Sequence, residues 1–157
     1  CTLPEIGELR THGEFTEISR DAKIAYPDDF PSHWSKFSGL LMSAVDPSHR
    51  EFAFHSPEPE TPSPAIVIRL NQPRQVRHVS IQNRRNAAFY GRAKDLALWI
   101  SGDGQHWKQV WKSEQPLENY SIDLPPDTSA QFLKIGLDGS GILHLNQVVV
   151  YGPTSDR

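Results

Sequence analysis

The chain has 157 residues, a formal net charge of -3 at pH 7 and a pI near 6.2. This length suits one domain that buries a core without disulfides, and the acidic balance argues against nucleic-acid binding, which usually needs a basic excess. No apolar run approaches the roughly 18 residues that a membrane-spanning helix requires, and no signal peptide is visible. The 13 prolines and 10 glycines leave little room for long helices, because proline interrupts helices and central strands.

The N-terminal segment, residues 1–37, contains Pro4, Pro27 and Pro31 and shows no apolar periodicity. We therefore expect an irregular segment that packs on the rest of the domain. Cys1 is the only cysteine, which excludes an internal disulfide. A cysteine at this position is compatible with the lipid-bearing residue of a processed lipoprotein or with a thiol that has an outside partner. We favour the simpler interpretation, a domain boundary.

From residue 51 onward, short β-like segments recur at intervals of about ten residues, and loops rich in proline and glycine separate them. The predicted strands cover residues 51–56, 65–70, 75–83, 95–101, 106–113, 119–124, 131–137 and 144–152. Asp103-Gly104 is a strong signal for a tight turn between two of these strands. The pattern predicts one all-β domain over residues 1–157, an antiparallel β-sandwich or jelly roll.

In two of the predicted strands large aliphatic side chains recur at every second position, which places them on a single face of each strand. These apolar side chains are Leu96, Leu98, Ile100, Leu133, Ile135 and Leu137. The tryptophans of the central strands are expected in the core or on a sheet surface, and they are Trp99, Trp107 and Trp111. The alternation supports strands that are buried on one face.

A series of motifs follows one another in a familiar order: "AVD", "EFAFHS", "PAIVIRL", "VSIQNR", "LWISGDGQHWKQVW", "QFLKIGL" and "LHLNQVVVYG". The most specific are the turn with Ser101, Asp103, Gly104 and Trp107 and the closing "VYG". Over about residues 38–152 the chain resembles the discoidin family, also called the coagulation factor V/VIII type C family, which overlaps carbohydrate-binding module family 32. The resemblance implies a galactose-binding-domain jelly roll of about eight strands. It also implies a binding module, with its ligand held by loops at one end.

The segment "NRRNAAFYGR", residues 83–92, is longer and richer in arginine than a simple turn. In sugar-binding relatives of the discoidin type, arginines on the corresponding loop contact sugar hydroxyls. A fucose-binding subgroup has an arginine followed seven positions later by Arg or Lys, and Arg85 and Arg92 have that spacing. However, Arg84 is the arginine that directly follows the strand, and Ala87 stands where the subgroup has aspartate. Fucose specificity therefore does not carry over to this chain.

The chemistry of this loop suits a glycan. A guanidinium group offers five donors in a planar fork that matches vicinal hydroxyls, a carboxylate or a sulfate, so an acidic sugar is as credible as galactose or fucose. An aromatic ring can cover the apolar face of a sugar. The alternative is that Arg84 and Arg92 pair with nearby acids while Phe89 packs on the barrel. The candidate ligand-binding residues are Arg84, Arg85, Asn86, Phe89, Tyr90 and Arg92.

Two further loops are candidates. The resemblance implies a histidine or aromatic contact from the segment before "AVD", where His33, Trp34 and Lys36 stand. Trp34 would either face the ligand or plug one end of the barrel, because large aromatics dominate both interfaces and cores. The glycines of residues 138–143 allow a close backbone approach to a ligand, but an ordinary turn is the preferred interpretation.

The resemblance also implies a structural Ca²⁺ ion, held by the loop after "AVD" and by a glutamate of the last strand. Asp46 and Ser48 occupy the first part, but the last-strand position is Gln147 and Pro47 replaces a common glycine. Calcium affinity depends on the number of charged oxygens, and one is lost here. We therefore treat Asp46 as a turn residue and the calcium site as the less favoured alternative.

Nothing in the sequence indicates an enzyme. The seven histidines are scattered, and neither "HExxH" nor "GxSxG" occurs. His78 and His144 lie in predicted strands and are expected to be structural residues with satisfied hydrogen bonds. A convergent acid, base or nucleophile is what catalysis would need, so we expect a non-catalytic domain.

The sequence thus predicts a glycan-binding module, extracellular, periplasmic or on the cell surface, within a larger multidomain protein. The alternative is a discoidin-type module that binds a protein or phospholipid through the same loops. The acidic balance gives no general attraction to anionic lipid, so membrane insertion is not expected.

Overall fold

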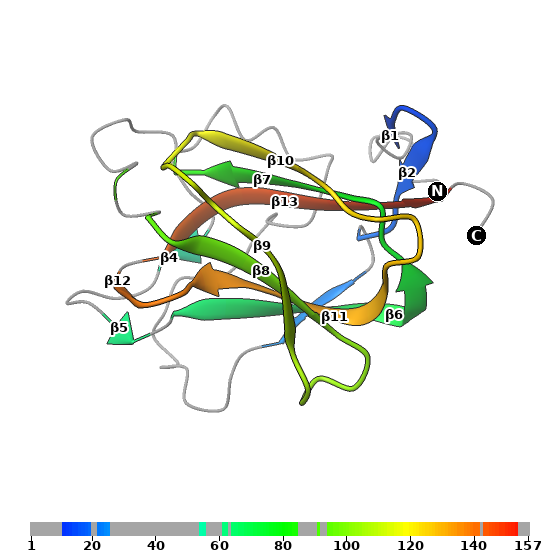
Figure 1. Cartoon of the computed structure of the whole chain (residues 1–157), viewed down its shortest axis with the longest axis horizontal. Coiled ribbons are helices and arrows are strands. Elements are labelled where there is room, and N and C mark those ends of the chain that lie inside the picture. Colours follow the sequence, from blue (N-terminus) through cyan, green and yellow to red (C-terminus); the bar gives the residue numbers. More distant parts are fainter. Residues whose placement is uncertain are drawn as a thin grey trace, which may run out of the picture.

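The computed structural model describes residues 11–19, 22–25, 54–55, 61–62, 64–84, 91, 94–141 and 143–153. These residues form two antiparallel sheets that lie face to face, together with a short two-stranded ladder (Figure 1). Among them, no helix has the length and apolar composition needed to cross a membrane. The predicted all-β antiparallel sandwich is confirmed.

The first sheet has the strand order β1-β2-β13-β7-β10, and β4 also pairs with β13. Its strands are β1 (Thr11–His12), β2 (Phe15–Glu17), β4 (Phe54–His55), β7 (His78–Asn83), β10 (Asn119–Asp123) and β13 (His144–Pro153). The long strand β13 runs between β2 and β7, so it joins the N-terminal hairpin to the middle of the sheet (Figure 1).

The second sheet has the strand order β3-β6-β11-β8-β9. Its strands are β3 (Lys23–Ala25), β6 (Ala65–Gln75), β8 (Leu96–Ser101), β9 (Lys108–Lys112) and β11 (Ser129–Leu137). A separate ladder pairs β5 (Thr61–Pro62) with β12 (Ser140–Gly141). Every pairing between described strands is antiparallel, and most connect segments far apart in the sequence.

The core lies between the two sheets and is built from the inward faces of alternating strands. The predicted apolar faces of β8 and β11 are buried in it, with Ile100 packed against it as a partly buried residue. The largest fully buried side chains are Ile66, Ile68, Leu70, Ile81, Leu96, Leu98, Leu133, Ile135, Leu143 and Leu145. Burial of one such side chain contributes about 1.5–3 kcal/mol relative to its exposed state, so this layer holds the sheets together.

The tryptophans of the central strands take partly buried positions. Trp111 packs against the core and meets Tyr120 edge-on, with ring centroids 5.4 Å apart. Trp99 and Trp107 lie beside Lys134, whose Nζ is 4.7 Å and 4.9 Å from the two ring centroids. The prediction of core or sheet-surface positions on strands is confirmed for Trp99 and Trp111, whereas Trp107 lies just before β9 and outside the strands.

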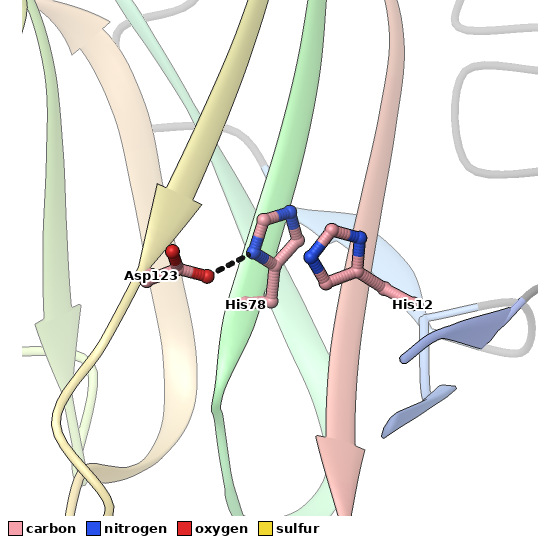
Figure 2. A group of neighbouring side chains, drawn as sticks. All are labelled: His12, His78 and Asp123. Carbon is pink, nitrogen blue, oxygen red and sulfur yellow. Dashed lines mark hydrogen bonds and ion pairs between the residues drawn. The ribbon is translucent and has the colours of Figure 1, made fainter. Parts of the chain in front are cut away.

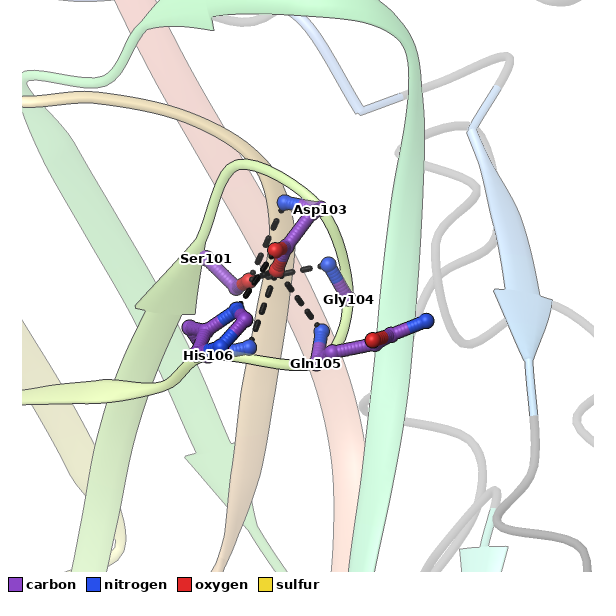
Figure 3. Close-up of polar contacts among 5 residues, drawn as sticks. All are labelled: Ser101, Asp103, Gly104, Gln105 and His106. Carbon is purple, nitrogen blue, oxygen red and sulfur yellow. Dashed lines mark hydrogen bonds and ion pairs between the residues drawn. The ribbon is translucent and has the colours of Figure 1, made fainter.

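The predicted Asp-Gly turn joins β8 to β9 and is held by a dense set of hydrogen bonds (Figure 3). Asp103 Oδ1 accepts the backbone N–H of Gln105 at 2.8 Å and of His106 at 2.9 Å, while Oδ2 lies 2.7 Å from His106 Nδ1. Ser101 Oγ accepts the N–H of Gly104 at 2.8 Å. These bonds, led by that from the His106 backbone, hold the pKa of Asp103 well below its usual value. Gly104 has φ 79°, which explains why glycine occupies this position.

The structure corrects the prediction for the N-terminal segment. The sequence predicts an irregular segment over residues 1–37, but the described part of it contains β1, β2 and β3. Each has only two or three residues, too few to show an alternating pattern. The pairing of β1 with β2, of β2 with β13 and of β3 with β6 supplies the hydrogen bonds that the local sequence does not predict.

Strand β6 is longer than predicted and runs through Pro73 to Gln75. Pro73 falls inside a register irregularity of the pairing between β6 and β11, where Ala130 pairs with Arg74 and Phe132 with Arg69. Proline donates no backbone hydrogen bond, and a bulge is a position where a strand tolerates it.

Candidate functional site

Several chain segments meet at one end of the sandwich, on the left in Figure 1. Strand β7 ends there at Asn83, which lies opposite Leu145 near the start of β13. In the second sheet, β11 ends at Leu137 opposite Leu96, the first residue of β8. The arginine-rich loop of residues 83–92 and the loop of residues 138–143 therefore leave the sandwich at the same end.

The base of the arginine-rich loop is fixed by Asn83, which is 1% exposed. Its Nδ2 donates to the carbonyl oxygen of Leu117 at 3.0 Å, and its Oδ1 accepts the backbone N–H of Arg84 at 2.7 Å. His144 Nδ1 lies 2.9 Å from the same Oδ1, and it must carry the proton because that oxygen only accepts. The backbone N–H of Asn83 donates to the carbonyl oxygen of Glu118 at 2.7 Å. Asn83 thus ties β7 to β13 and to the segment before β10.

Arg84 follows this anchor directly and is partly exposed. Its backbone position is determined by the bond to Asn83, so the first arginine of the loop leaves the sheet in a defined direction. The remaining predicted loop residues lie outside the described residues, and they are Arg85, Asn86, Phe89, Tyr90 and Arg92. The structure therefore places the start of the predicted site and leaves the rest as a prediction.

The second candidate loop, with His33, Trp34 and Lys36, also lies outside the described residues. The strands that flank it are described. Ala25 at the end of β3 pairs with Val67 near the start of β6, and Phe54 in β4 pairs with Leu145 of β13. Both flanking strands thus reach the end of the sandwich where β7 stops.

Acidic groups at this end are held by a lysine of β9. Lys112 Nζ lies 3.6 Å from Asp95 Oδ1 and 3.4 Å from Asp138 Oδ2, and Gln109 Nε2 donates to Asp138 at 3.2 Å. These contacts, the bond from Gln109 first, lower the pKa of Asp138. Asp95 and Asp138 also share a backbone hydrogen bond of 2.9 Å. The contacts fix the start of the loop of residues 138–143. An ordinary turn was the preferred interpretation, but Ser140–Gly141 within this loop form β12 and pair with β5.

Of the residues implied as calcium ligands, the structure describes Gln147. Gln147 is 5% exposed and lies opposite Gln82 on the outer face of the first sheet, where it lines a cavity of about 280 Å³. The described residues around this cavity carry hydroxyl, amide and apolar groups but no carboxylate. Calcium binding depends on charged oxygens, which the other implied ligands would have to supply, so the calcium site stays a prediction. Asp46 and Ser48 lie outside the described residues.

The sequence predicts that His144 is a structural residue, and its burial and the bond of its Nδ1 to Asn83 agree with a structural role. Sequence reasoning also placed Asn83 at the start of the loop. It missed that Asn83 anchors the loop, because its partners lie 34 and 61 positions away in the chain. A buried asparagine at the end of a strand would have been the available signal.

Comparison with known proteins identifies the family of this chain and agrees with the β-sandwich fold. The F5/8 type C domain family matches residues 32–145, and the chain therefore belongs to that family. The resemblance found in the sequence is confirmed. A comparison with curated protein sequences gives no match.

Several solved structures share the fold. A CBM32 module from a family 31 glycoside hydrolase of Clostridium perfringens has 19% identity and a TM-score of 0.64, with 85% of this chain and 96% of that chain covered. A fucose-binding module of Streptococcus pneumoniae has 23% identity and a TM-score of 0.62, with 86% and 96% covered. A fucolectin from striped bass, Morone saxatilis, has 15% identity and a TM-score of 0.70, with 88% and 49% covered.

Proposed function

We propose that this domain is a non-catalytic carbohydrate-binding module that holds a glycan with the loops at the end of the sandwich where β7 stops. The observation that carries the proposal is the anchored position of Arg84. This residue begins an arginine-rich loop at the end of β7, where Asn83 fixes the backbone. Glycan binding by structural neighbours supports it, since one is a fucose-binding module and another was solved with GalNAc-β-1,3-galactose.

The roles follow from the chemistry of the side chains. Arg84, Arg85 and Arg92 would donate paired hydrogen bonds to vicinal hydroxyls or to an acidic group of the sugar. Asn86 would both donate and accept. A stacking surface for the apolar face of the sugar ring would come from Phe89, Tyr90 or Trp34, with His33 and Lys36 at its edge.

The anchor makes this proposal physically reasonable. A loop that is fixed at its base loses less conformational freedom when the ligand binds, so more of the contact energy appears as affinity. Affinity of the single module is nevertheless expected to be weak, because one or two sugar units bury little area. A larger extracellular or periplasmic protein with repeated modules or a tethered enzyme would raise the effective affinity.

A glycan array, probed with the isolated domain in calcium and again with a chelator, tests the proposal. We expect binding to a narrow set of glycans. A difference between the two conditions would establish a calcium site, which would have to draw its charged ligands from residues such as Asp46. A blank array from folded protein would contradict glycan binding and favour a protein or phospholipid ligand for the same loops.

Variants locate the site. Arg84→Ala and Arg92→Ala should each weaken binding about tenfold or more, which corresponds to about 1.4 kcal/mol, with a nearly unchanged Tm. Arg69→Ala is the matched control, because Arg69 is exposed on β6 of the other sheet. A large fall in Tm for Arg92→Ala would instead mean that Arg92 is structural.

A further inference from the structure

A second cluster of polar side chains lies at the other end of β7, away from the arginine-rich loop. It consists of His12 on β1, His78 at the start of β7 and Asp123 at the end of β10 (Figure 2). His78 and Asp123 are direct partners across the sheet. His12 comes from the N-terminal hairpin and lies against the other side of the His78 ring (Figure 2).

The ring of His78 is held firmly. It is 0% exposed, its Nδ1 is 2.7 Å from Asp123 Oδ1, and its Nε2 is 3.1 Å from Ser121 Oγ. A carboxylate only accepts hydrogen bonds, so the Nδ1 atom carries a proton, and in the neutral imidazole the Ser121 hydroxyl then donates to Nε2. Tyr151 packs edge-on against the same ring at 5.6 Å. The orientation of His78 is therefore fixed before any ligand arrives.

We propose that His12, His78 and Asp123 form a binding site for a divalent transition-metal ion, with Zn²⁺ as the best fit. One ligand atom from each residue lies within 4.8 Å of the other two. Two imidazoles and a carboxylate form a donor set that zinc binds, whereas calcium prefers oxygen alone. Bond lengths of about 2.0–2.2 Å around a tetrahedral ion place ligand atoms roughly 3.3 Å apart, so the longest separation closes by about 1.5 Å at most. His78 Nδ1 and Asp123 Oδ1, which are 2.7 Å apart, have to open by about 0.6 Å.

The existing hydrogen bonds suit an exchange of the Nδ1 proton of His78 for a metal ion. The ion takes the place of the proton between His78 Nδ1 and Asp123. The neutral ring takes up a proton from solvent at Nε2 as Nδ1 releases its own, so no net proton is lost. His78 Nε2 then carries a proton, and the hydroxyl of Ser121 accepts it, because a hydroxyl can accept as well as donate. A hydrogen bond on the second ring nitrogen is the usual support of a metal-bound histidine.

His12 has to move for the site to close. Its ring is stacked on His78 with centroids 3.7 Å apart and an interplanar angle of 14°. The lone pair of an imidazole nitrogen lies in the ring plane, so two parallel rings cannot both point at one ion. His12 is exposed on a two-residue strand, which leaves its side chain room to rotate. Metal binding would thus fasten the hairpin of β1 and β2 to β7 and β10.

Zinc titration of the full chain by calorimetry, on protein without a polyhistidine tag, tests the proposal. We expect one ion per chain with an affinity in the micromolar range and a Tm that rises with zinc concentration. His12→Ala and Asp123→Asn should each weaken binding at least tenfold. Both residues are exposed, so these variants are expected to fold.

His106→Ala is the matched control. His106 forms a pair with Asp103 of the same 2.7 Å length, but this exposed pair belongs to no three-residue cluster within the described part of the chain. Zinc affinity should be unchanged in this variant. The proposal is overturned if wild-type protein binds no zinc at millimolar concentration, or if His106→Ala weakens binding as much as His12→Ala does.

Discussion

Asn83 shows how one side chain can support both the fold and the proposed site. Replacing it with alanine removes the partners of the Leu117 carbonyl, the Arg84 N–H and His144 Nδ1. A buried polar group that loses its partner costs about 1–3 kcal/mol. We expect Asn83→Ala to lower the free energy of unfolding by at least about 2 kcal/mol in urea denaturation, and to weaken glycan binding as well.

Asn119→Ala is the comparison for that variant. Asn119 is exposed and accepts a single hydrogen bond of 3.1 Å from Gln82, so its loss should cost less than about 0.5 kcal/mol. Equal destabilisation by the two substitutions would show that Asn83 has no special role at the base of the loop.

Asp103 predicts a pH dependence of stability. Its folded-state pKa lies below the ordinary value of 3.8, so its carboxylate stabilises the fold above that pH. The contribution is lost as the pH falls from about 3.8 toward the lower folded-state pKa. Asp103→Asn keeps an acceptor oxygen but no charge. We expect wild-type protein to melt at a higher temperature than the variant near pH 7, and the difference to shrink at about pH 2.5. A constant difference would contradict this.

Gly136 is required by the packing of two strands, because β6 and β11 approach closely where Gly136 pairs with Ala65. A Cβ atom on Gly136 would overlap the carbonyl oxygen of Pro64 and the Cβ of Ala65. Backbone cannot move aside cheaply, so Gly136→Ala should destabilise the domain by about 2 kcal/mol or more in urea denaturation. Gly102→Ala is the control, since a Cβ there meets nothing within 4 Å. Similar stability of both variants would count against the close approach.

The sequence predicts the strands that have a local pattern of side chains and misses those that depend on a distant partner. In strands β8 and β11 large aliphatic side chains recur at every second position, and the sequence predicts both with nearly correct bounds. β1, β2 and β3 have two or three residues each. They exist through pairing: β1 with β2, β2 with β13, and β3 with β6. No local pattern encodes such pairing, because it depends on where the partner strand lies. The Asp-Gly turn was predicted correctly, since its hydrogen bonds all fall within a few residues.

In the whole molecule, one candidate site could be predicted from the sequence and the other could not. The position of the arginine-rich loop at the end of a strand followed from local sequence and family resemblance, and the start of that loop at Arg84 agrees with the structure. The cluster of His12, His78 and Asp123 could not be foreseen, because strand register brings together residues 45 positions apart and a hairpin adds the third. Sequence spacing alone indicated scattered histidines.

The positions of the first and last described strands bear on how the module would work in a larger protein. Phe15 of β2 pairs with Pro153 at the end of β13, whereas Asn83 pairs with Leu145 at the opposite end. The start of β2 and the end of β13 therefore lie at the end of the first sheet opposite Asn83 (Figure 1). Copies joined in tandem would leave each loop end open to a glycan.

Tandem copies should therefore gain avidity. Two domains joined by a flexible linker are expected to bind a glycan-coated surface about 10²-fold or more tightly than one domain, because the second binding event becomes intramolecular. Surface plasmon resonance on the glycan identified by the array measures this gain. A tandem protein with Arg84→Ala in one copy should return to the affinity of the single domain. If that protein still binds as tightly as the intact tandem, the loop after β7 does not contact the glycan, and the site must be sought elsewhere on the sandwich.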